Sequence, residues 1–211
     1  MTSNDIFKES AVIFLSALVI GLGLSFTGNG FSTFMLAFTT MLVILLINIF
    51  AKKMFGYHLE TNVTTKLWTT YYFGLKNREH FKSKLAMIWM PLVTSLITMG
   101  NFVWLAITEF DVTARPERVA KRHGLYRYTE VTEWHMSLIA VAGIMANIFF
   151  GVLAYFFGFE YFAKWSIIYA FWSIIPLGRL DGSKIFFGSR NLWFGLSIIL
   201  FVLLLWGLTI V

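Results

Sequence analysis

Cysteine is absent from this chain of 211 residues, and charged residues make up only 13% of it. Without cysteine there can be no disulfide, no thiolate zinc site and no cysteine nucleophile. The charged fraction lies far below the roughly 25% of an average soluble domain, which argues against an ordinary cytosolic enzyme. A disordered chain is excluded as well, because 58% of the residues are hydrophobic.

Long apolar runs account for this composition. A helix needs about 20 apolar residues to cross a bilayer, so a chain of this length holds about six such helices. We therefore predict a single-domain, all-α polytopic protein that is integral to the membrane, which would be the cell membrane in a prokaryote. The predicted helices span 11–26, 31–50, 85–108, 135–157, 162–175 and 192–211.

The segments between these runs suit a membrane surface. The formal net charge is +6, and the basic residues cluster between the apolar runs, where they would meet anionic lipid headgroups. After the second helix, threonines and aromatics predict a small interfacial hairpin or an amphipathic segment. The aromatic stretch 68–73 is either an interfacial belt or an edge that receives an unwound peptide strand.

The loop 115–130 carries basic residues interleaved with tyrosines. It either contacts headgroups or docks a soluble partner. Nucleic acid is excluded as a partner, since neighbouring acidic residues cancel the local positive charge.

One acidic residue stands between two apolar runs beside a predicted helix break. Asp181 follows Pro176, which ends a helix, and precedes Gly182, which permits a tight turn. An acid at the bilayer centre costs roughly 3 kcal/mol, so such a residue often has a function. Asp181 is either a ligand or proton carrier, or an interfacial turn residue paired with Arg179 or Lys184.

The fourth predicted helix carries a second feature. Gly143, Asn147 and Gly151 are spaced four apart and share one face. Small residues let helices approach closely, and an asparagine amide hydrogen-bonds across such a contact. Taken alone, this pattern favours helix packing, and a face that contacts substrate is the alternative.

Two segments of the chain resemble site-2 proteases, a family of intramembrane zinc metalloproteases. Ala142-Gly-Ile-Met-Ala-Asn147 is similar to the family's Ala-Gly-Pro-x-Ala-Asn helix, and Pro176-Leu-Gly-Arg-Leu-Asp-Gly182 is similar to its Pro-x-x-x-Leu-Asp-Gly turn. The resemblance implies a site-2-protease-like core. It also implies a substrate groove shaped by Gly143, Asn147, Pro176, Asp181 and Gly182.

The family's zinc-binding His-Glu-x-x-His helix has no counterpart. Aligning Lys53-Met-Phe-Gly-Tyr57 with the stretch that follows this helix in archaeal-type members puts the two zinc histidines near Ile44 and Asn48 and the general base on Leu45. A catalytic zinc needs about three protein ligands and an open position, so Asp181 alone cannot hold it. A rebuilt site would have to recruit His58 or His135, which lack the spacing of a zinc pair.

These observations predict a non-catalytic relative of the family, without a cofactor. It would bind membrane lipids and single-span membrane proteins or unwound peptide, as a scaffold or regulator. One alternative is an active metallopeptidase with an unrecognised zinc site. Another is a small transporter or lipid-binding protein in which Asp181 titrates.

Overall fold

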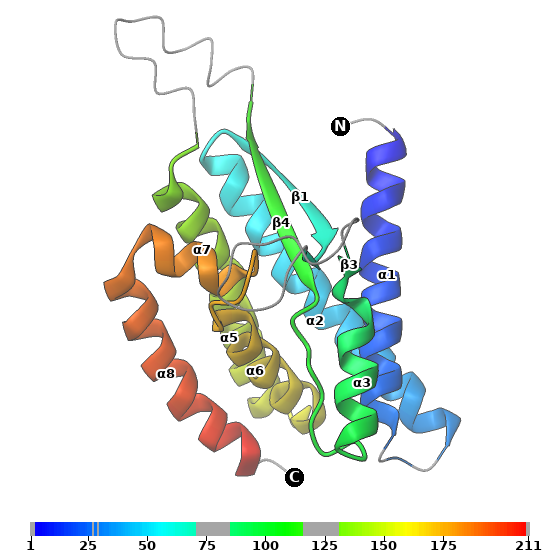
Figure 1. Cartoon of the computed structure of the whole chain (residues 1–211). Helices are drawn as coiled ribbons and strands as arrows, with labels where there is room; N and C mark the ends of the chain where they lie inside the picture. Colours follow the sequence, from blue (N-terminus) through cyan, green and yellow to red (C-terminus); the bar gives the residue numbers. More distant parts are fainter. Residues whose placement is uncertain (1–2, 27, 29, 71–84, 116–130, 210–211) are drawn as a thin grey trace, which may run out of the picture.

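The computed structural model describes residues 3–26, 28, 30–70, 85–115 and 131–209, and it is mostly helical (Figure 1). Within these residues, four helices are long and apolar enough to cross a membrane: α1 (Ser3–Ser25), α2 (Phe31–His58), α5 (Glu133–Phe156) and α8 (Arg190–Thr209). This fits the predicted all-α membrane protein, with four candidate spans among the described residues in place of six. The elements are α1 (Ser3–Ser25), α2 (Phe31–His58), β1 (Thr61–Leu67), β2 (Thr69–Thr70), β3 (Leu85–Ala86), η1 (Met87–Trp89), α3 (Met90–Ile97), β4 (Thr108–Ala114), α5 (Glu133–Phe156), α6 (Glu160–Ile174), α7 (Asp181–Gly188) and α8 (Arg190–Thr209).

The predicted helix over 85–108 is wrong. Pro91 stands at the start of α3, where its missing N–H costs nothing, and α3 has only eight residues. Met99 and Gly100 then adopt positive φ angles of 52° and 82°, which end the helical path. Residues 101–107 run as extended chain back toward the sheet, with Leu105 and Ile107 fully buried.

Three further segments differ from the sequence prediction. Helix α2 continues to His58, beyond the predicted end at residue 50, because Lys52 and Lys53 both find acidic partners inside the fold. The run 162–175 does form a helix, α6, but its 15 residues are too few for a span. The segment between the predicted helices 162–175 and 192–211 contains the short helix α7.

The strands form two antiparallel pairs, and the longer pair joins strands that are not consecutive in the chain. β1 pairs antiparallel with β4, from Thr61 opposite Ala114 to Leu67 opposite Thr108. β2 pairs with β3, which agrees with a small hairpin-like element after the second helix, although its connection at 71–84 lies outside the described residues. The β1–β4 ribbon lies across α2 at the end of the molecule where the N-terminus is found (Figure 1).

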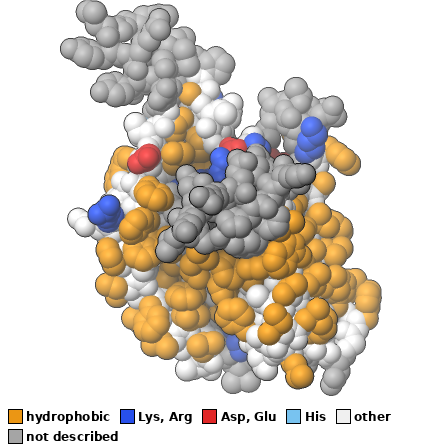
Figure 2. Space-filling model, viewed as in Figure 1, with side chains coloured by type: hydrophobic (Ala, Val, Ile, Leu, Met, Phe, Trp, Pro, Cys, Tyr) orange, Lys and Arg blue, Asp and Glu red, His pale blue; other side chains and the backbone are white. Residues whose placement is uncertain are grey.

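The surface matches this layout. On the face shown in Figure 2, hydrophobic side chains cover most of the area below the sheet, and charged side chains gather mainly toward the sheet end. Exposed large hydrophobics such as Phe194, Ile198 and Phe201 follow one side of α8. Such a surface suits contact with lipid chains.

Candidate functional site

A buried ion pair lies at the centre of the candidate site. Lys52 Nζ donates to Asp181 Oδ2 at 2.5 Å, and the two side chains are only 4% and 5% exposed. Lys52 lies on the same face of α2 as Asn48 and Ile44, which are one and two turns earlier in the helix and also buried. This face is where the family resemblance implies the two zinc histidines.

The turn before α7 places Asp181. Helix α6 ends because Ile175 is extended and Pro176 follows it. Gly178 has a φ of 54°, and a side chain there would meet the Trp68 ring at 2.9 Å. A Cβ at Gly182 would come within 2.1 Å of the Ile174 carbonyl oxygen, so α7 begins tightly against the end of α6. Asp181 therefore occupies the first turn of α7, where the helix dipole favours a negative charge.

Helix α5 closes the site from the other side. A Cβ at Gly143 would lie 2.6 Å from Lys52 Cε and 2.9 Å from Asn48 Nδ2, so only glycine leaves room for these side chains. Further along the same face, Gly151 packs against Ser166 of α6. The predicted close helix approach at Gly143 and Gly151 is confirmed.

Several buried polar side chains retain hydrogen-bonding capacity, among them Asn48, Asn147 and Asp181. Both amide atoms of Asn48 and of Asn147, and Oδ1 of Asp181, have no hydrogen-bond partner among the described residues. Asn147 is fully buried and Asp181 is 4% exposed, so neither lines an open groove in this conformation. Buried polar atoms without partners are uncommon, and each costs about 1–3 kcal/mol.

Strand β4 covers the ion pair with an aromatic ring. Lys184 Nζ lies 3.4 Å and Lys52 Nζ 5.0 Å from the centroid of Phe110, a geometry typical of cation–π contacts. Lys184 also donates to the backbone carbonyl of Phe110. Burial lowers the pKa of Lys184 to about 8, against the opposing attraction of Asp181.

Acidic side chains flank Phe110 on the same strand. Arg179 approaches Glu109 at 3.9 Å and Asp111 at 3.8 Å, and Lys66 of β1 binds Asp111 at 2.7 Å. Burial raises the pKa of Glu109, while Arg179 opposes this shift. Burial also acts to raise the pKa of Asp111, but the hydrogen bond and charge of Lys66 outweigh it, and the net shift is downward.

The aromatic stretch predicted as a belt or strand-accepting edge begins inside the fold. Trp68 is 7% exposed and stacks on Trp104 with ring centroids 6.1 Å apart. Its backbone N–H donates to Ile107 and its carbonyl accepts from Met87, so its backbone is already paired on both sides. Residues 71–73 lie outside the described part of the chain, as does most of the predicted docking loop 115–130.

The two histidines that could serve as metal ligands lie on different helices, α2 and α5. His58 is exposed at the last turn of α2, and His135 is near the start of α5, where its ring contacts Thr132 at 2.5 Å. Within the described ranges, no three His, Asp or Glu side chains group closely enough to hold a metal ion. Oδ2 of Asp181, the retained candidate ligand, already binds Lys52.

Sequence reasoning missed Lys52 and Phe110, and it offered Arg179 or Lys184 as the partner of Asp181 where the structure has Lys52. The apolar pattern places Lys52 at the membrane interface, as the end of a helix that in fact continues. Its spacing of four residues from Asn48 and eight from Ile44 is the signal that could have found it. Nothing in the local sequence points to Phe110, because its role depends on the pairing of β1 with β4.

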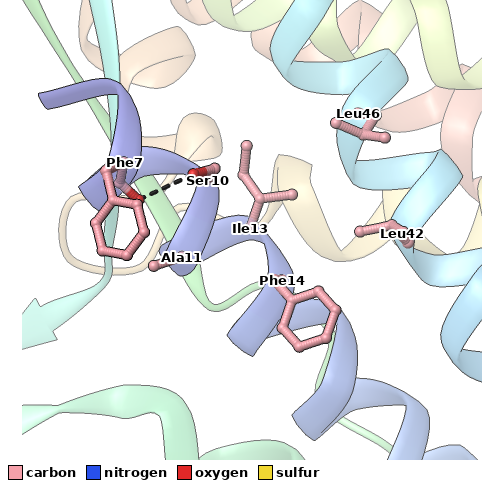
Figure 3. Close-up of a pocket in the computed structure, with 7 residues that line it drawn as sticks. All are labelled: Phe7, Ser10, Ala11, Ile13, Phe14, Leu42 and Leu46. Carbon is pink, nitrogen blue, oxygen red and sulfur yellow. Dashed lines mark hydrogen bonds between the residues drawn. The ribbon is translucent and has the colours of Figure 1, made fainter. Parts of the chain in front are cut away.

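A groove between α1 and α2 is separate from this site. It measures about 400 Å³ and has almost entirely apolar walls (Figure 3). The hydroxyl of Ser10 is turned back to the Phe7 carbonyl at 2.9 Å, so it offers no polar group to the groove. The lining residues are Phe7, Ser10, Ala11, Ile13, Phe14, Leu42 and Leu46. These walls suit a lipid chain better than a polar ligand.

No protein-family model matches the chain, and no curated protein or solved structure matches it.

Proposed function

We propose that this chain is an integral membrane protein with a site-2-protease-like core and no protease chemistry, which binds transmembrane or unwound peptide segments as a scaffold or regulator. The observation that carries the proposal is the contact between Lys52 and Asp181. In the family the third zinc ligand is the aspartate of the Leu-Asp-Gly turn, and here an ammonium group from α2 holds that carboxylate.

The chemistry of this pair opposes a catalytic metal. A zinc ion bound to Asp181 would have to displace Lys52 or share the carboxylate with a second cation at close range, which Coulomb repulsion disfavours. The positions that would supply the other ligands and the general base, Ile44, Asn48 and Leu45, carry no imidazole or carboxylate. Activation of a water molecule to attack a peptide bond has no support in this residue set.

The same site has features that suit peptide binding. The amides of Asn48 and Asn147 each have an unpaired donor and acceptor, which is what a backbone amide needs, and because both are buried they become available to a peptide only when the packing around them opens. The β1–β4 ribbon provides extended backbone next to the Pro176–Gly182 turn, where Arg179 approaches Glu109 and Asp111. A helix that unwinds in a bilayer must find partners for its backbone groups inside a protein, and these groups are candidates for that task.

A defined probe tests the proposal. The protein is reconstituted in lipid vesicles with a fluorescent single-span Leu/Ala peptide of about 24 residues, interrupted by a central Gly-Asn-Gly. Saturable energy transfer from the protein, stronger than with an uninterrupted Leu/Ala peptide, is expected. Equal, unsaturable transfer with both peptides would overturn the proposal, and zinc-dependent cleavage of the probe would favour the metallopeptidase alternative.

A transporter is the second candidate, because charged residues inside a helical membrane protein often mark an ion or proton path. The buried Lys52–Asp181 pair is the observation that favours it. Vesicle flux of protons or small ions that is abolished in Asp181→Asn, together with no peptide binding, would decide for transport.

A further inference from the structure

The register of β4 shows which of its backbone groups face away from β1. Thr65, opposite Phe110, donates its N–H to Glu9 Oε1 at 2.9 Å and therefore points away from β4. Arg115 and Trp68 donate across the ribbon instead, to Glu60 and Ile107. In an antiparallel pair these two kinds of position alternate, so the N–H and C=O of Phe110 point to the outer edge of β4.

That outer edge is held by α7 and the turn before it. Lys184 donates to the outward carbonyl of Phe110 and lies over its ring. Arg179 reaches the carboxylates of Glu109 and Asp111, on either side of Phe110. Of these two cations, Lys184 is the one that contacts the backbone. It binds the Phe110 carbonyl, which is the acceptor that a neighbouring strand would use.

We infer that Lys184 caps the outer edge of β4: it occupies the Phe110 carbonyl that an added peptide strand would need, and it must leave before such a strand can pair there. This inference rests on the proposed function, because Lys184 would oppose the strand pairing by which a peptide binds. Lysines at exposed strand edges commonly prevent unwanted pairing, and here the lysine is engaged directly with the acceptor.

Loss of the Lys184 contact should raise the affinity of β4 for an added peptide strand. When Lys184 cannot donate, the Phe110 carbonyl is left without its partner until a peptide N–H supplies one. A hydrogen bond from a charged donor is stronger than one between neutral groups, so Lys184 competes effectively for this carbonyl. Removing the competitor should therefore tighten strand addition by roughly tenfold.

Disulfide trapping measures this directly, because the chain has no cysteine of its own. Thr113→Cys, an exposed position on β4, is combined with the Gly-Asn-Gly probe carrying one cysteine next to its interruption. The peptide concentration that gives half-maximal crosslinking is compared in this background, in Lys184→Met, and in Arg179→Met. Arg179→Met removes one positive charge from the same edge without freeing a backbone acceptor.

The expected result is a roughly tenfold lower half-maximal concentration in Lys184→Met and little change in Arg179→Met. Equal values in the parent and Lys184→Met, with saturable peptide binding intact by energy transfer, would overturn the cap and leave the proposed function standing. No binding of the probe to any variant would overturn both. A thermal melt of Lys184→Met in detergent checks that it remains folded, and Lys184→Arg, which keeps a charged donor, should behave like the parent.

Discussion

Lys52 and Asp181 are 129 positions apart in the chain, yet their side chains meet at 2.5 Å with almost no exposure to solvent. This pair joins α2 to α7, the two helices that supply the charged residues at the centre of the candidate site. Taking two charges out of water is costly, and the pair is stable only while both members are present.

Lys52→Met is therefore expected to lower the stability of the protein by about 3–5 kcal/mol, because it leaves the Asp181 carboxylate buried without its cation. The double variant Lys52→Met/Asp181→Leu should recover most of this loss, since no buried charge remains. Thermal unfolding in mild detergent measures both. Lys66→Met, which breaks the exposed pair with Asp111, is the control and should cost less than about 1 kcal/mol. If Lys52→Met is as stable as the parent, the buried pair does not hold α2 to α7.

The packing of α5 against the pair gives a second test. Gly143→Ala would place a methyl group 2.6 Å from Lys52 Cε, and Lys52 cannot move freely because its amine is bound to Asp181. We expect a loss of about 1–3 kcal/mol in detergent unfolding. Gly195→Ala on α8 is the matched control, since a Cβ there would meet no described atom within 4 Å, and it should be neutral or slightly stabilising. Similar effects of the two changes would contradict the close approach at Gly143.

Much of the fold follows from local sequence. The apolar runs that form α1, α2, α5 and α8 are predictable because a bilayer demands long uninterrupted helices. The run 85–108 is misleading, because apolar composition alone does not separate a membrane helix from a buried extended segment. Pro91 and Gly100 are compatible with kinks within one helix, whereas in the structure they mark where α3 starts and where its path is broken.

The candidate site is predictable only in part. Asp181 stands out because it is an acid between apolar runs, which is a local property. Its partner does not, because a lysine after a long apolar run is normally at the interface. Which cation satisfies Asp181, and which ring covers it, depends on contacts between α2, β4 and α7 that no local pattern encodes.

Glu109 offers a test of the electrostatics around β4. Burial raises its pKa above the unfolded value of 4.5, so the folded state binds this proton more tightly than the unfolded state does. Stability attributable to Glu109 is therefore present at low pH and is lost as the pH rises above 4.5 through the raised pKa. Glu109→Gln should leave the melting temperature nearly unchanged at about pH 4 and raise it at about pH 7.

Asp111→Asn is the control of opposite sign. The pKa of Asp111 lies below its unfolded value of 3.8, since Lys66 outweighs the effect of burial, so its charge stabilises the fold above that pH. This variant should lower the melting temperature at about pH 7. If both variants lower it equally at that pH, the burial of Glu109 is not the dominant effect.

Restoring a metal site tests whether the core has the arrangement that the family resemblance implies. The combined change Ile44→His, Leu45→Glu and Asn48→His places two imidazoles one turn apart with a general base between them, and Lys52→Ala frees the carboxylate of Asp181. If α2 and α7 stand in the family's geometry, this variant should bind about one zinc per chain, measured by elemental analysis after dialysis. Adding Asp181→Asn to the same variant should abolish the binding. A folded variant that retains no more zinc than the parent would show that Lys52 does not occupy the place of a lost metal.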